Sequence, residues 1–175
     1  MKGDMNLTTK QLSLCAVLAA LALALSWTEN FLPLSLAIPI PGIKLGLANI
    51  VTVFALYALG PGQALLILVS RCLLGAAFAG NVNALLYSLM GGVSAMLVMI
   101  LLYRRRSLSV YGVSVAGAAA HNCGQVAAAV LTLGNTAPVH YLPVLLIVSV
   151  FTGALMGFAS GLLFRSLRHT NLWRK

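Results

Sequence analysis

The segment NALLYSLMGGVSAMLVMILLY, residues 83–103, carries no charged side chain and is followed directly by Arg104, Arg105 and Arg106. A helix needs roughly 20 mostly apolar residues to cross the hydrocarbon core of a bilayer, and this segment has that length. The rest of the chain is similar, because 61% of its residues are hydrophobic and only 7% are charged. A soluble domain is about half apolar, so the composition predicts an integral membrane protein.

The chain contains six apolar segments that are candidates for spanning helices. The second and third are joined by Gly60-Pro61-Gly62, which breaks a helix and predicts a tight hairpin. Both of these segments are short, so one or both could be partly re-entrant. We therefore predict an all-α, polytopic six-helix bundle in one membrane domain, residues 11–168, between a tail at 1–10 and a basic tail at 169–175. The predicted spans are 11–31, 45–60, 62–80, 83–103, 109–133 and 142–166.

The basic residues predict the orientation of this bundle. The net charge of +9 does not indicate nucleic-acid binding, because the cations flank apolar runs and are not interleaved with aromatic residues on a polar face. If both termini are cytoplasmic, nine of the eleven basic residues lie inside, as the positive-inside rule requires. The two left over are Lys44 and Arg71. The nine are Lys2, Lys10, Arg104, Arg105, Arg106, Arg165, Arg168, Arg174 and Lys175.

Two loops are then expected outside. Residues 32–44 hold three prolines yet remain apolar. Such a segment is expected either to cover the outer face of the bundle as a lid or to be a connector lying in the interface. Residues 134–141 form the second outer loop and could contribute to the same surface.

The sequence offers little for catalysis or for metal binding. Its only acidic residues are Asp4 and Glu29, so no aspartate-rich pair exists to hold Mg²⁺ on a diphosphate. No motif for covalent catalysis is present. The three cysteines, Cys15, Cys72 and Cys123, lie in apolar runs without metal-site spacing and are expected to be small buried hydrophobes. We predict a protein that is not an enzyme and has neither cofactor nor metal.

Two stripes of small residues indicate close helix packing. Gly153, Gly157 and Gly161 form overlapping G-x-x-x-G units, for which packing inside this bundle is favoured over a dimer interface. Ala16 and Ala20 form a similar stripe in the first span, and packing within the bundle is again the simplest interpretation of the stripe alone.

The rare polar residues of the spans are the candidate ligand-binding groups. Arg71 lies in the middle of the third span and needs a partner, because a bare guanidinium in hydrocarbon is costly. Glu29 could pair with Arg71 or with Lys44, and such a pair could fix helix packing or contact a ligand. His121 and Gln125 are four residues apart and share a helix face, whereas Asn122 lies roughly 100° around the helix.

These groups are predicted to converge in the outer half of the bundle, below residues 32–44. Topology brings them to a similar depth, and a mostly apolar pocket with a few oriented polar groups is how small-molecule sites are built. The alternative is that these polar residues serve helix packing and bind no ligand. The predicted lining residues are Glu29, Asn49, Arg71, His121, Asn122 and Gln125, with Asn81, Asn83, Tyr87 and Ser88 as further candidates.

Five segments carry a resemblance to a known family: PGIKLGLANI (41–50), SRCLLG (70–75), LYSLMGG (86–92), HNCGQ (121–125) and YLPVL (141–145). Together they resemble the Gx transporter family, whose members are also named heptaprenyl diphosphate synthase component I. The resemblance covers nearly the whole chain. It implies that the polar residues named above, with Lys44, are recurring positions of the family.

That family is in turn similar to the substrate-binding S components of energy-coupling factor (ECF) transporters. The similarity implies six spans, cytoplasmic termini in a bacterial cell membrane, and a lid at 32–44. It also implies that Ala16 and Ala20 dock on a transmembrane T component driven by two ATPases. The chain would bind a small organic molecule from outside and hand it inward.

Two alternatives stay open. The chain could be a non-catalytic membrane subunit that supports a soluble prenyl diphosphate synthase in isoprenoid-quinone synthesis. It could also be a structural membrane adaptor without a ligand.

Overall fold

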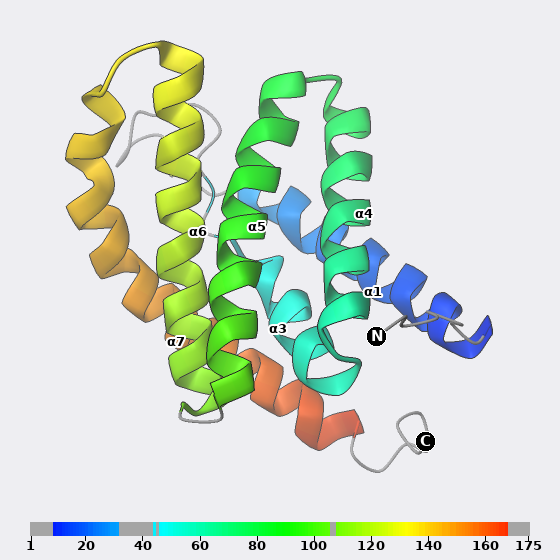
Figure 1. The fold of residues 1–175 in the computed structure, drawn as a ribbon. Helices are drawn as coiled ribbons and strands as arrows, with labels where there is room; N and C mark the ends of the chain where they lie inside the picture. The colour runs from blue at the N-terminus through cyan, green and yellow to red at the C-terminus, as the bar shows by residue number, and fades with distance from the viewer. Residues whose placement is uncertain (1–8, 32–43, 45, 106–107, 168–175) are drawn as a thin grey trace, which may run out of the picture.

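The computed structural model describes residues 9–31, 44, 46–105 and 108–167, and these are almost entirely helical (Figure 1). No strand occurs among the described residues, so the predicted all-α class is confirmed. The elements are α1 (Thr9–Thr28), the 3₁₀ turn η1 (Glu29–Phe31), α3 (Asn49–Ala58), α4 (Pro61–Ala79), α5 (Val82–Arg105), α6 (Val110–Leu133), the 3₁₀ turn η2 (Ala137–Tyr141) and α7 (Leu142–Leu167).

Glycine, proline and serine set most of the helix ends, which is why the sequence predicted them closely. Gly60 has a φ of 100° and precedes Pro61 at the first position of α4. Left-handed Gly80 and Gly134 end α4 and α6, as glycine commonly does after a helix. The Ser109 side chain accepts a hydrogen bond of 3.3 Å from the Gly112 N–H and caps the start of α6.

The second predicted span, 45–60, contains a shorter helix than expected. Residues 46–48 form a turn in which the Asn49 N–H donates to the Gly46 carbonyl over 2.8 Å, and α3 has only 10 residues. At 1.5 Å per residue it is about 15 Å long, too short for a bilayer core of about 30 Å. Seven of its residues are buried, and it contacts α1, α4, α5, α6 and α7. Helix α3 is therefore the centre of the bundle.

Within the described ranges, four segments are long and apolar enough to cross a membrane: α1, α4, α5 and residues Ala137–Ser166. Helix α6 is as long as α5 but is not one of these four segments. The α4–α5 and α6–η2 connections lie at one end of the bundle, and the α3–α4 connection, the end of α5 and the start of α6 lie at the other (Figure 1). This alternation is the one that the hydropathy pattern predicted. The side of the membrane that each end faces stays a prediction.

Close glycine contacts hold α6 and α7 together. A Cβ atom at Gly153 would lie 2.5 Å from Val115 Cα, and one at Gly157 would lie 3.0 Å from Tyr111 Cα. Gly153 and Gly157 of α7 thus pack against the backbone of α6, as expected for internal packing.

One expectation about small residues was wrong, and the structure excludes one of the two interpretations of the alanine stripe. Cys15 and Cys72 are buried, but Cys123 is exposed, because it lies on the face of α6 turned away from α5 and α7. Ala16 and Ala20 are exposed on α1, whereas the neighbouring Cys15 and Ala19 are buried. The stripe therefore does not serve packing inside the bundle.

Candidate functional site

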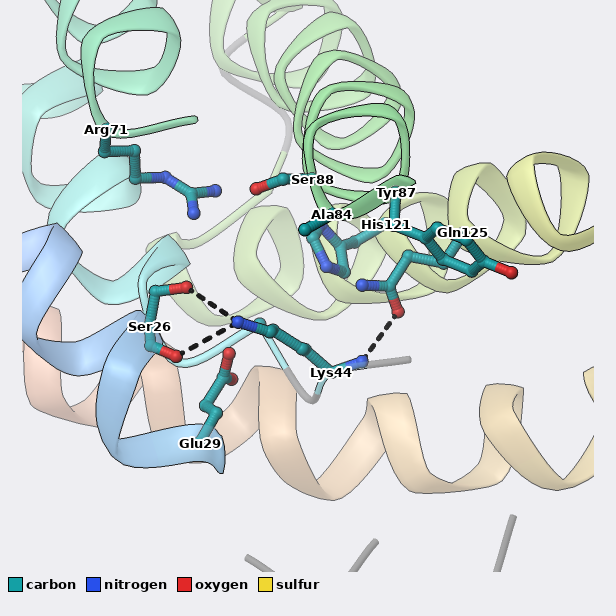
Figure 2. A pocket seen from close by; sticks show the side chains of 10 residues that line it. Ser26, Glu29, Lys44, Arg71, Ala84, Tyr87, Ser88, His121 and Gln125 are labelled. Atoms are coloured by element: carbon teal, nitrogen blue, oxygen red, sulfur yellow. Dashed lines mark hydrogen bonds between the residues drawn. The ribbon is translucent and has the colours of Figure 1, made fainter. Parts of the chain in front are cut away.

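The bundle encloses a cavity of about 50 Å³ where α1, α4, α5, α6 and the segment before α3 meet. Four of the six predicted ligand-binding residues line it: Glu29, Arg71, His121 and Gln125. Figure 2 shows these side chains turned toward one another from different elements. The lateral convergence that the sequence could not establish is therefore present. The other lining residues are Ser26, Lys44, Gly46, Ala84, Tyr87 and Ser88.

Three residues just before α3, Lys44, Gly46 and Leu47, form or adjoin one wall of the cavity, and Lys44 and Leu47 are fixed at three points. The Lys44 backbone N–H donates to Gln125 Oε1 over 3.2 Å, and the Lys44 ammonium donates to the Ser26 carbonyl and hydroxyl oxygens over 3.3 and 3.4 Å (Figure 2). The Leu47 N–H donates to Glu29 Oε1. Glu29 and Gln125 thus act as anchors for these residues.

Gly46 allows the chain to lie close to α6 at this point. Its φ of 83° lies in the left-handed region, which favours glycine. A Cβ atom there would be 3.0 Å from Asn49 Nδ2 and 3.2 Å from His121 Cδ2. A side chain at this position would therefore be both strained and crowded.

Arg71 projects from the middle of α4 toward the other cavity residues (Figure 2). Only 4% of it is exposed, and its Nε and Nη2 atoms make no hydrogen bond. The guanidinium lies against Gly92 of α5, where a Cβ atom would be 3.5 Å from Nη2. As predicted, Arg71 does not face lipid. Among the described residues, no carboxylate forms an ion pair with it within 4.0 Å.

Neither expected ion pair of Glu29 is formed. The carboxylate is 3% exposed, and within the described part of the chain no lysine or arginine nitrogen lies within 4.0 Å of it. Glu29 interacts with Lys44 and Arg71 only through longer-range electrostatic attraction. Burial lowers the pKa of the Lys44 ammonium, and the negative charge of Glu29 opposes this effect.

His121 is held edge-on between two glycines. Beyond Gly46, the ring also approaches Gly91 of α5, where a Cβ atom would lie 2.9 Å from His121 Cε1. The side chain is 3% exposed, and Nε2 has no hydrogen-bond partner. A neutral imidazole can use such a nitrogen as either donor or acceptor, depending on the tautomer.

Two predicted residues do not line the cavity. The Asn122 side chain donates to the Leu145 carbonyl over 2.9 Å and so ties α6 to α7. Its different helical face, noted from the sequence, accounts for this. Asn49 is buried beside Gly46, and its side-chain amide makes no hydrogen bond. Of the further candidates, Tyr87 and Ser88 line the cavity, whereas Asn81 and Asn83 are exposed.

Some cavity residues were missed by the sequence reasoning. Ser26 is three positions before Glu29, so the helical spacing alone would have placed both on one face. Gly91 and Gly92 do not line the cavity, but they lie against His121 and Arg71 and were not considered, although two adjacent glycines in an apolar helix indicate close approach of other groups. Lys44 was expected as a partner for Glu29 and as a recurring position of the family, but not as a lining residue. The rest of the predicted lid, 32–43, lies outside the described residues.

A groove on the outer surface of α1 and α4 contains the alanine stripe. It has a volume of about 340 Å³ and an almost wholly apolar lining, which includes Ala16, Ala20, Leu66 and Leu74. It is separate from the polar cavity, because the two share no lining residue.

Comparison with known proteins now adds the family. The family model described as heptaprenyl diphosphate synthase component I matches residues 18–163. The chain belongs to this family. The search of curated proteins and the search of solved structures each returned no significant match.

The match to heptaprenyl diphosphate synthase component I covers every residue that lines the polar cavity. Within the matched range, the sequence contains one carboxylate, Glu29. The described residues contain no group of three or more histidine, cysteine or acidic side chains that could hold a metal ion. The name of the family associates this chain with a prenyl synthase, and its fold is that of a membrane protein.

Proposed function

We propose that this chain is the substrate-binding membrane component of an uptake transporter for a small organic molecule, such as a vitamin or a precursor of quinones or isoprenoids. It spans the bacterial cytoplasmic membrane several times and has both termini inside. The ligand enters from outside and is held by Arg71, His121 and the residues around them. Energy for its release comes from partner proteins.

The observation that carries this proposal is the polar cavity itself. Side chains from five separate parts of the chain meet there, and Arg71 and His121 keep unused hydrogen-bonding groups. A buried group without a partner destabilises a fold by roughly 1–3 kcal/mol, more when it is charged. Packing alone gives no reason to retain such groups, whereas a ligand would satisfy them.

The exposed alanine stripe supports a membrane-embedded partner. Small residues let a second helix approach closely, and Ala16 and Ala20 present such a face in the α1–α4 groove. By resemblance the partner is an ECF-type T component with its two ATPases.

Native mass spectrometry of the detergent-purified protein tests the proposal. A small molecule that is retained by the wild type and lost from an Arg71→Ala variant is the expected result. A wild-type protein that carries no ligand, and that no small molecule stabilises, would argue against a binding function.

The family supports a second candidate, a non-catalytic membrane subunit of heptaprenyl diphosphate synthase. In this role the chain would recruit a soluble prenyl synthase to the membrane. Affinity purification from native membranes distinguishes the two functions. A T component and ATPases in the eluate support transport, and a soluble prenyl synthase supports the subunit role. The chain alone is what a structural adaptor without either role predicts.

A further inference from the structure

The cavity contains more positive than negative charge. Lys44 and Arg71 line it with one carboxylate, Glu29, so one positive charge is in excess when all three are ionised. These three charged groups are not equally free to bind a ligand. Lys44 is bonded to Ser26, and Glu29 accepts from the Leu47 N–H. Arg71 is left as the buried cation without a bonded partner.

The chemistry of Arg71 narrows the choice of ligand. A guanidinium does not lose its proton in proteins, so its burial must be compensated by an anion and not by neutralisation. The two nitrogens without partners, Nε and Nη2, lie on the same edge of the guanidinium. That edge can make two parallel N–H···O bonds to a planar anion, the arrangement in which arginine binds carboxylate.

The size of the cavity favours a carboxylate over a diphosphate. A water molecule needs about 10–15 Å³ of such a space, so about 50 Å³ admits roughly three to five water-sized groups. A carboxylate, with three heavy atoms, fits this space. A diphosphate is several times larger and carries more negative charge than one excess cation balances.

We propose that the cavity recognises a single carboxylate group of the ligand, bound by Arg71 and flanked by Lys44 and by Nε2 of His121. This inference rests on the proposed function, because it names the chemical class of the ligand of that same site. The ligand is then a small organic monocarboxylate and not a prenyl diphosphate.

Acetate and acetamide are the probes that test this inference, because they have the same shape and differ in charge. Thermal unfolding of the detergent-purified full chain is followed as each is added at constant ionic strength, with pyrophosphate as the third probe. We expect acetate to stabilise the wild type saturably and acetamide to have no comparable effect. In Arg71→Gln the affinity for acetate should fall about 10- to 100-fold, as expected for loss of hydrogen bonds to a charged group.

Arg105→Gln is the matched control, since Arg105 is an exposed arginine at the far end of α5. Its affinity for acetate should equal that of the wild type. Arg71→Lys keeps the positive charge but loses the two parallel N–H donors of the guanidinium, so it should recover little of the affinity for acetate. If Arg71→Gln does not fold, the wild-type comparison of acetate with acetamide still decides the matter.

Three results would overturn the carboxylate assignment: equal effects of acetate and acetamide, stronger stabilisation by pyrophosphate, or an acetate effect that survives in Arg71→Gln. The retained molecule in native mass spectrometry separates this failure from that of the proposed function. A retained ligand without a carboxylate leaves the binding function intact and refutes the assignment. No retained ligand and no response to any probe refute both.

Discussion

Replacement of Gly91 by alanine should impair ligand binding while leaving the protein folded. The new Cβ atom would lie 2.9 Å from both Gln125 Cγ and His121 Cε1. Carbon atoms in good contact are about 3.5–4.0 Å apart, so both side chains must move by roughly 0.5–1 Å. Overpacking of this kind costs about 1–3 kcal/mol, and alanine regains about 1 kcal/mol over glycine in a helix. The net loss of stability is thus about 0–2 kcal/mol.

The same displacement has a larger effect on the site. Gln125 accepts the Lys44 N–H over 3.2 Å, so a shift of this size takes the pair beyond hydrogen-bonding distance. His121 loses its position at the same time. Ligand retention in native mass spectrometry should fall severalfold, while chemical denaturation in detergent detects only the modest loss of stability.

Gly161→Ala is the control for this experiment. The nearest atom to a Cβ there is Tyr111 Oη at 3.9 Å, an ordinary contact, so stability and ligand retention should match the wild type. Wild-type ligand retention in Gly91→Ala, with the fold intact, would show that the wall formed by His121 and Gln125 takes no part in binding.

Three further predictions address packing, docking and topology. Asn122→Ala removes the bond to the Leu145 carbonyl and should lower the free energy of unfolding by about 0.5–1.5 kcal/mol, with unchanged ligand retention; a loss of ligand would place Asn122 in the site after all. Ala20→Leu adds bulk to the α1–α4 groove and should abolish co-purification of the membrane partner but not ligand binding. An Arg105→Cys variant in a cysteine-free background should react with an impermeant thiol reagent only from the cytoplasmic side, and labelling of intact cells would contradict the predicted orientation.

Helix boundaries were predictable because local chemistry determines them. The turn at Gly60-Pro61 and the left-handed glycines at Gly80 and Gly134 end helices regardless of what packs nearby. The length of α3 was not predictable in this way. Hydropathy reports that a segment is apolar, but it does not distinguish a lipid-facing span from a short helix surrounded by protein.

The polar residues of the cavity were predictable in part, but their bonding was not. Sequence identified Glu29, Arg71, His121 and Gln125 because polar groups are rare in these segments, and the structure brings all four to one cavity. Which of them are already bonded depends on where Lys44 and Leu47 lie. The bond from the Leu47 N–H to Glu29 is a backbone contact, and residue identity carries no signal for it.

The charges in the cavity show whether it could bind the Mg²⁺-diphosphate that the name of the family suggests. Glu29 is the one carboxylate in the range matched by the family model, and it is bonded to the backbone of Leu47. Binding of a Mg²⁺-diphosphate needs several oxygen ligands with charges that balance the metal. This cavity has the opposite charge balance, because it holds two cations, Arg71 and Lys44, and only one carboxylate, which is already bonded. Such a cavity favours binding of an anion that carries no metal. If this chain supports prenyl synthesis, we infer that the carboxylates for Mg²⁺ come from its partner. This chain would then anchor the partner at the membrane and provide the binding site for an organic anion.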